Sequence, residues 1–201
     1  MSGLGWMYGA DLPLLSLTFA RDISARELLE RMGAEPGDIA IRSQREFADE
    51  FGDVLFEDDC SVVSTGRYGE WALAREHSSW RCVESEQLVR DVAAGTAALV
   101  VHANEKPMVE IRYAEEGHLV TGINTLFGLG PDGRTGAVPG KFDPALQSLG
   151  ADLRNPRGTD YGPLGLRGLF FRLAEELGVG IPHADLTENP VLCAELEPRV
   201  D

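Results

Sequence analysis

The sequence predicts an α+β fold: a largely antiparallel sheet of about five or six strands, with helices packed mainly on one face. Three observations lead to this prediction. Helical segments begin at serine caps, apolar segments are joined by tight turns, and the composition, 43% hydrophobic and 25% charged, is that of a globular protein. We expect one domain over residues 1–201, with its core in 10–126, a Gly/Pro-rich loop at 127–144 and a C-terminal helical segment at 145–201.

The first part of the chain is expected to alternate strand and helix. Residues 14–22 are mostly apolar and include β-favouring Thr and Phe, which predicts a strand. Ser24 and Glu27 have the spacing of a capping box, in which each side chain binds the backbone amide of the other residue, so a helix is expected to follow. The same spacing recurs at Ser43 and Glu46 and predicts a second helix.

A β-hairpin is predicted from residues 60–66 and 70–77, because a short Gly-containing loop separates two β-favouring segments. A short strand is also expected at 39–41. Successive side chains of a strand point to opposite faces of its sheet. One face of the second hairpin strand then carries Trp71, Leu73, Arg75 and His77, and the other carries Ala72, Ala74 and Glu76. Glu76 should therefore point away from His77, and the two do not form a catalytic pair.

In the middle of the chain, a serine cap at residue 85 predicts a third helix at 85–95. Residues 96–103 are continuously apolar over most of their length, which predicts a buried central strand. Residues 107–124 alternate apolar and polar side chains around an EEGH turn, and this pattern predicts a second hairpin. The segment 127–144 is rich in Gly and Pro and is expected to be a long loop. Leucines and Phe170 at helical spacing predict an amphipathic helix at 164–178.

The charge of the chain restricts its partners. The sequence has 33 acidic and 18 basic residues, a net charge of −15. A field of this sign repels nucleic-acid phosphates and anionic lipids, so we expect no nucleic-acid and no membrane partner. The three cysteines are far apart in the sequence, no signal peptide is recognisable, and no apolar run approaches the roughly 20 residues that span a bilayer. These features predict a cytoplasmic protein.

No motif in the sequence identifies a reaction. The four histidines and three cysteines lack the spacings of known metal sites, so we expect no metal. The Gly-rich stretch has neither the P-loop nor the dinucleotide-binding spacing, and no nucleophile elbow is present, so no cofactor and no catalytic residues are predicted. The residues favour a protein that is not an enzyme.

The first candidate site is the acidic segment between residues 46 and 59. It lacks the alternating ligands of a calcium loop and is either a solvated helix face or an anionic patch that attracts a basic protein. Its acidic residues are Glu46, Asp49, Glu50, Asp53, Glu57, Asp58 and Asp59. On this basis we expect a non-enzymatic binding protein, immunity-like or regulatory, that engages a basic protein partner through this segment.

The alternative is an enzyme or small-ligand-binding protein. Its pocket would lie between the sheet and the C-terminal helix and would use dispersed residues, namely Arg75, His77 and His102. A deep polar cleft that contains these three side chains would favour this alternative. The sequence leaves the oligomeric state open.

Several stretches resemble an actinobacterial family of unknown function (6461-like). They are LTFARDISARELLERMGA, GEWALAREHSSW, LVRDVAAGTAALVVHANEKPMVEIRYAEEGHLV and GLFFRLAEELGVGI. The resemblance covers roughly residues 6–190. It implies a strand and a capped helix, a Trp-bearing strand, a short helix, a central strand, an acidic-Gly hairpin and a C-terminal helix. Since the family has no established activity, the resemblance implies no catalytic residues.

Overall fold

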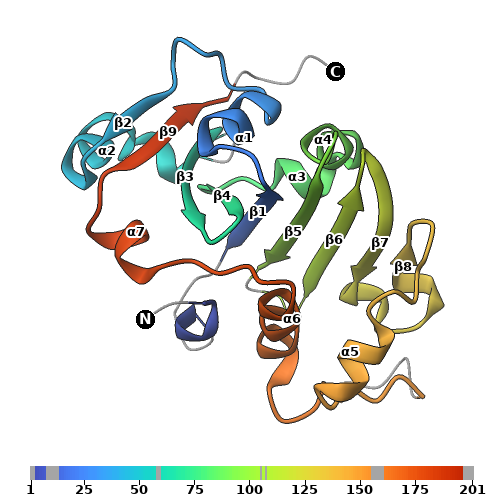
Figure 1. Cartoon of the computed structure of the whole chain (residues 1–201). Helices are drawn as coiled ribbons and strands as arrows, with labels where there is room; N and C mark the ends of the chain where they lie inside the picture. The colour runs from blue at the N-terminus through green and yellow to red at the C-terminus, as the bar shows by residue number, and fades with distance from the viewer. Residues whose placement is uncertain are drawn as a thin grey trace.

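The computed structural model describes residues 3–7, 14–57, 60–104, 106, 108–154 and 161–196. Its strands are β1 (Leu15–Arg21), β2 (Ala40–Arg42), β3 (Val62–Tyr68), β4 (Trp71–Glu76), β5 (Ala97–Ala103), β6 (Val109–Glu115), β7 (His118–Asn124), β8 (Arg134–Thr135) and β9 (Val191–Glu195). They form one twisted sheet in the order β2-β9-β3-β4-β1-β5-β6-β7-β8, and every neighbouring pair is antiparallel (Figure 1).

The α+β class and the antiparallel sheet are confirmed, but the expected strand number was too low. The sheet has nine strands within the described residues, where about five or six were expected. Two of the nine strands lie in segments for which no strand was predicted: the short edge strand β8, inside the predicted Gly/Pro-rich loop, and β9, in the predicted C-terminal helical segment. A strand of two residues shows no alternation, and β9 is only five residues long, so neither gives a clear sequence pattern.

The helices are α1 (Ala25–Arg31), α2 (Gln44–Phe51), α3 (Arg81–Glu84), α4 (Glu86–Val92), α5 (Asp143–Ser148), α6 (Gly165–Glu176) and α7 (His183–Thr187), with single 3₁₀ turns η1 (Gly5–Met7), η2 (Val54–Phe56), η3 (Thr125–Phe127) and η4 (Pro131–Gly133). The predicted serine caps are present. The hydroxyls of Ser24, Ser43 and Ser85 accept backbone N–H bonds at the starts of α1, α2 and α4.

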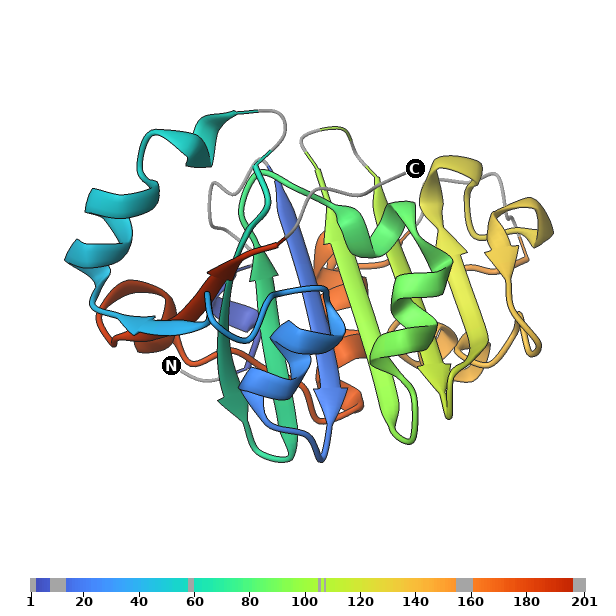
Figure 2. The ribbon, with the colours of Figure 1, turned by 90° about the horizontal axis from the view of Figure 1, so that it is seen from above.

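Helices cover both faces of the sheet, which corrects the expectation of one covered face. We call the side of α1, α3 and α4 the α4 face and the side of α6 the α6 face; they lie above and below the sheet in Figure 1, and Figure 2 views the α4 face. The physical reason is the strand pattern: β1, β4 and β5 are buried along nearly their whole length, so both of their faces need a cover.

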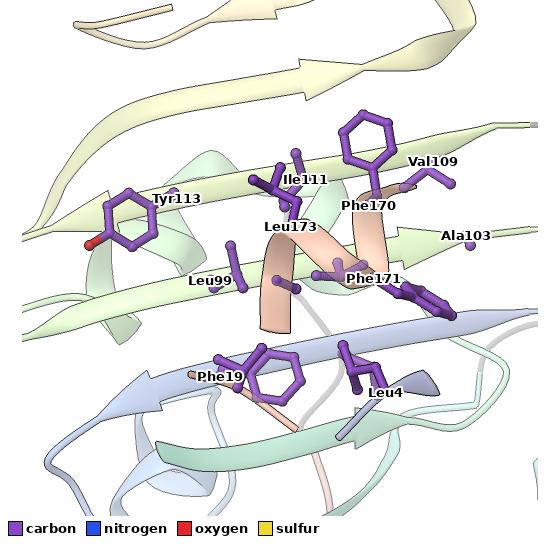
Figure 3. Close-up of a cluster of buried hydrophobic side chains, with 14 of the residues drawn as sticks. Leu4, Phe19, Leu99, Ala103, Val109, Ile111, Tyr113, Phe170, Phe171 and Leu173 are labelled. Atoms are coloured by element: carbon purple, nitrogen blue, oxygen red, sulfur yellow. The ribbon is translucent and has the colours of Figure 1, made fainter. Parts of the chain in front are cut away.

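The larger core lies on the α6 face. Phe170, Phe171 and Leu173 of α6 join strand residues such as Phe19 and Ile111 in one buried cluster (Figure 3). On the opposite face the strands contribute mainly small residues, which let α1 and α4 pack close to the sheet: Ala20, Ala72, Ala74, Ala98 and Ala114. The C-terminal helix therefore packs on the same sheet as the N-terminal elements.

None of the helices in the described ranges is long and apolar enough to cross a membrane.

Candidate functional site

A row of polar side chains crosses the α4 face near one end of the central strands. Ser16 of β1 lies opposite Glu76 of β4 and opposite His102 of β5. His102 in turn lies opposite Glu110 of β6, which lies opposite Asn124 of β7. Residues directly opposite each other in a sheet project from the same face. We call these five residues the polar row.

Glu76 connects the polar row to α3. Its buried carboxylate accepts hydrogen bonds from the hydroxyls of Ser16 at 3.2 Å and Ser79 at 2.8 Å, and from the amide of Arg81 at 2.6 Å. The amide of Cys82 donates a further bond at 3.3 Å. The first backbone N–H groups of a helix have no acceptor within the helix, and the Glu76 carboxylate supplies one. Glu76 therefore fixes the position of α3 over the end of the sheet.

Glu110 is held from two sides. Its carboxylate accepts bonds from Arg112, with Nε at 2.7 Å, and from the side-chain amide of Asn124 at 2.8 Å. Arg112 also donates to the backbone carbonyl of Val83 in α3. The ion pair is largely shielded from solvent, with 18% of the Arg112 side chain and 13% of the Glu110 side chain exposed. These contacts tie β6 to α3.

A pocket of about 510 Å³ opens between α3 and the ends of β5 and β6. It is lined by Leu14, Trp80, Val83, Glu84, His102, Asn104, Lys106, Met108 and Glu110. We call it the His102 pocket. Its walls include apolar side chains and Trp80, which is 39% exposed. The pocket thus offers an apolar surface together with several polar groups.

Two polar atoms of this pocket are buried without a partner. Nδ1 of His102 and Oδ1 of Asn104 make no hydrogen bond to any part of the chain that the structure describes. Burial lowers the pKa of His102 to about 4, so the imidazole is neutral at neutral pH and presents one donor and one acceptor. Buried polar atoms in proteins are nearly always hydrogen-bonded. Both atoms belong to side chains that line the His102 pocket, so the wall of the pocket holds two unsatisfied polar atoms.

Arg75 and His77 do not line the His102 pocket. Arg75 lies opposite Leu17 and Ser64, and Leu17 belongs to the core of the α6 face. His77 packs against Phe47 of α2, with 5.1 Å between the ring centroids. The structure thus does not bring together the three residues of the sequence-predicted pocket, and the pocket that holds His102 is on the sheet face opposite α6.

His77 and Ser64 form a pair that resembles a base and a nucleophile. Nε2 of His77 lies 2.8 Å from the hydroxyl of Ser64. Burial, with the nearby positive charge of Arg75, lowers the pKa of His77 to about 3. A general base works best with a pKa near the operating pH, so this imidazole is poorly suited to activate the serine. Glu76 points to the other face, as the alternation predicted.

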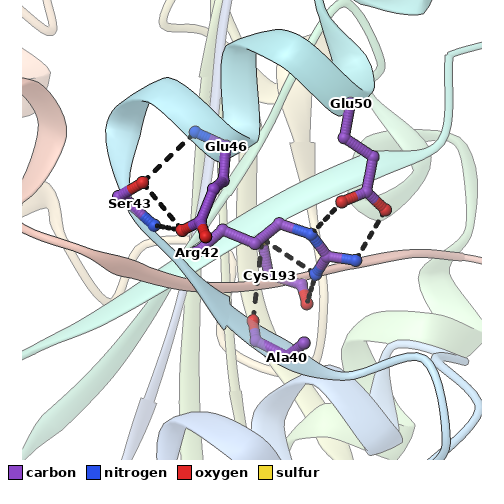
Figure 4. Close-up of polar contacts among 6 residues, drawn as sticks. All are labelled: Ala40, Arg42, Ser43, Glu46, Glu50 and Cys193. Carbon is purple, nitrogen blue, oxygen red and sulfur yellow. Dashed lines mark hydrogen bonds and ion pairs between the residues drawn. The ribbon is translucent and has the colours of Figure 1, made fainter.

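Much of the acidic segment has local partners. Glu46 completes the capping box with Ser43 (Figure 4), which lowers the pKa of Glu46. Asp49 lies 3.5 Å from Arg45 of the same helix. Asp53 is exposed. Glu57 is exposed as well, and neither side chain has a hydrogen bond or ion pair to another described residue. Asp58 and Asp59 lie outside the described residues.

Glu50 forms a two-pronged ion pair with Arg42. Nε and Nη2 of Arg42 lie 2.5 and 2.7 Å from the two carboxylate oxygens, and the pairing lowers the pKa of Glu50 (Figure 4). The same guanidinium contacts the carbonyl of Cys193 in β9 at 3.5 Å and lies over the ring of Phe51, 4.9 Å from its centroid. Glu50 therefore helps to fasten α2 to the edge of the sheet.

In the described ranges, no three His, Cys, Asp or Glu side chains are placed to hold a metal ion together. Sequence reasoning identified His102 but missed its neighbours Trp80, Asn104 and Glu110. One feature of the sequence indicated a polar site here. Glu76 lies on the same face of its strand as Ala72 and Ala74, which should be buried, and a buried carboxylate needs hydrogen-bond donors. The pairing of β1 with both β4 and β5, which assembles the polar row, has no comparable signal in the sequence.

The sequence model of one protein family matches residues 14–197, and that family is described as one of unknown function. No curated protein and no solved structure matches the chain.

Proposed function

Since the chain belongs to DUF6461, a family of unknown function, we propose a function from the site itself: it is a small-ligand-binding protein, and the His102 pocket is its binding site. The observation that carries the proposal is the pair of unpartnered buried atoms, Nδ1 of His102 and Oδ1 of Asn104, in one pocket. A ligand that hydrogen-bonds to both atoms would remove the cost of burying them unpaired.

The size and lining of the pocket support this function. Its volume of about 510 Å³ falls in the range of about 300–1,000 Å³ that is usual for small-molecule sites. Leu14, Trp80 and Met108 offer apolar contacts to a ligand, and hydrogen bonds to His102 and Asn104 would fix its orientation. Apolar side chains combined with polar groups that fix orientation are typical of ligand sites.

Binding fits the pocket better than catalysis. The two oxygens of Glu110 already accept bonds from Arg112 and Asn124, so this carboxylate is not available as a base. His102 is a weak base because burial lowers its pKa to about 4. His102 therefore lacks the properties of an efficient proton acceptor at neutral pH.

Ligand-observed NMR with a library of small polar ring compounds tests the proposal. The informative variants are His102→Leu and Asn104→Leu, which remove the two unpartnered atoms. Both are expected to fold, because an apolar side chain replaces a buried group that lacks a hydrogen bond. The matched control is His118→Leu, since His118 is exposed on β7 and lies outside the pocket.

We expect wild type and the control to bind a common set of compounds, and both pocket variants to bind them about tenfold more weakly, the effect of losing roughly 1.4 kcal/mol. If no compound binds, or if binding survives in both pocket variants, the His102 pocket is not the ligand site.

A second candidate function is binding of a basic protein through the acidic segment. It is favoured by the exposed side chains of Asp53 and Glu57, which have no partner among the described residues, and by the net charge of −15. Charge complementarity of this kind mainly speeds association and is screened by salt. Pull-downs from native lysate at low and high salt, with wild type and the double variant Asp53→Asn/Glu57→Gln, test it. A partner retained equally by both proteins would count against this segment.

A further inference from the structure

We propose that the ligand of this protein is a short, extended, basic peptide, which occupies the His102 pocket and a second pocket beside it. The inference rests on the proposed function and extends it. The second pocket has a volume of about 210 Å³ and is lined by Glu86, Glu110, Arg112, Ile123, Asn124, Phe127, Asp132, Gly133 and Thr135. Glu110 lines both pockets, so the two lie on either side of this residue, and we call them together the groove.

The groove contains three buried polar atoms that lack a partner within the described residues. Besides Nδ1 of His102 and Oδ1 of Asn104 in the first pocket, Nη1 of Arg112 is unpartnered in the second. The amide oxygen of Asn104 can only accept a hydrogen bond, and the guanidinium of Arg112 can only donate one. A ligand that satisfies both needs a donor at one end of the groove and an acceptor at the other.

The spacing of these groups matches a peptide backbone. Arg112 lies opposite Val100, and Asn104 follows Val100 by four residues along β5 and its continuation. Four residues of a strand extend about 13 Å, so the two positions are separated by roughly the length of four extended residues. An extended peptide offers N–H donors and C=O acceptors along this whole length.

The walls of the groove favour a peptide with positively charged side chains. Trp80 in one pocket and Phe127 in the other are 39% and 58% exposed, and exposed aromatic rings are common anchors for peptides. Glu110 and Glu86 of the lining are paired with Arg112 and Arg90, whereas Glu84 and Asp132 have no ion pair among the described residues and face one base, Lys106. Acidic walls next to aromatic faces attract Lys and Arg side chains, through charge and cation–π contact.

Fluorescence polarisation with labelled tetrapeptide pools tests this inference. Three acetylated and amidated pools carry a Lys, a Glu or only neutral residues, and a fourth is the Lys pool with N-methylated backbone amides. We expect the Lys pool to bind at least about tenfold more tightly than the Glu pool. We expect N-methylation to abolish binding, because it removes the backbone donors and leaves the charge unchanged.

A pair of neighbouring residues provides the matched variants. Phe127→Ala removes an aromatic wall of the second pocket, whereas Leu126→Ala removes a side chain of the same turn that is 69% exposed and lines neither pocket. Phe127→Ala should weaken binding of the Lys pool about tenfold. Leu126→Ala should leave it unchanged.

The outcomes separate this inference from the proposed function. If small compounds bind at His102 but the Lys pool binds no better than the Glu pool, the peptide inference is wrong and the ligand pocket stands. The peptide inference is also wrong if Phe127→Ala and Leu126→Ala change binding of the Lys pool equally. If neither compounds nor peptides bind, both proposals are wrong.

Discussion

The carboxylate of Glu76 lies 3.2 Å from the hydroxyl of Ser16 on the neighbouring strand, at one end of two central, largely apolar strands. The same carboxylate binds the amides of Arg81 and Cys82 in α3, so one buried side chain joins the polar row to the helix that forms a wall of the His102 pocket. Pocket geometry and sheet stability should therefore depend on the same residue.

Replacing Glu76 with alanine should lower the free energy of unfolding by about 3 kcal/mol, because the substitution leaves several buried donors without an acceptor. Glu76→Gln should cost less, since its amide oxygen still accepts. Urea unfolding followed by circular dichroism measures both values. Glu70→Ala is the control: Glu70 is exposed in the β3–β4 turn, and its loss should change stability by less than about 0.5 kcal/mol. Equal effects at positions 70 and 76 would contradict the role of Glu76.

The stability of the protein should fall between pH 6.5 and pH 5 because of two histidines. Burial lowers the pKa of His77 to about 3 and of His102 to about 4. Unfolded histidine titrates near pH 6.5, so on acidification the unfolded chain takes up these protons first. The stabilisation is complete above about pH 6.5 and is lost as the pH falls toward the folded pKa values. At pH 5 the loss is about 2 kcal/mol for each histidine.

Urea unfolding of wild type, His77→Gln and His102→Gln at several pH values checks this prediction. Each substitution should remove about half of the dependence in this window. Carboxylates contribute mainly at lower pH, because their ordinary pKa values lie near 4. A pH dependence that persists in the double variant of His77 and His102 would show that other groups cause it.

The α6 face should dominate the stability of the fold. Phe170 is fully buried against the sheet, and Phe170→Ala should cost about 3–5 kcal/mol through lost burial and the cavity that remains (Figure 3). Leu164 lies just before α6 and is 40% exposed, so Leu164→Ala should cost much less. Thermal unfolding of the two variants compares them directly. Similar losses would mean that α6 is not the main cover of this face.

Arg42→Met should destabilise the protein more than Glu50→Gln. The guanidinium of Arg42 contacts Glu50, Phe51 and Cys193 together, whereas the Glu50 side chain is 49% exposed and has Arg42 as its ion-pair partner (Figure 4). Exposed ion pairs contribute little, because solvent screens them. The midpoints of urea unfolding show which variant loses more stability. A larger loss in Glu50→Gln would contradict the view that Arg42 is the main residue that attaches α2 to the sheet.

Local features of this fold were predictable because they depend on short sequence patterns. The serine caps at residues 24, 43 and 85 and the hairpin of β6 and β7 are each encoded by a few neighbouring residues. Coverage of both faces was not predicted, although the apolar strand at 96–103 already indicated it. The strand β9 was missed because it pairs with β2 and β3, which lie far away in the chain.

The candidate site was predictable only in part, for the same reason. His102 was identified as a polar residue on a buried strand, but its grouping with Arg75 and His77 was based on residue type. Side-chain alternation alone cannot relate the faces of strands whose pairing is unknown. Asn104 and Trp80 join His102 through the order of β4, β1 and β5 and through the position of α3.

The most direct test of the central claim is a crystal structure of the protein soaked with compounds that bind in the NMR experiment. We predict density for the compound in the His102 pocket, with hydrogen bonds to Nδ1 of His102 and Oδ1 of Asn104. Compounds found elsewhere on the molecule, with a side chain of the protein itself bound to those two atoms, would contradict the account.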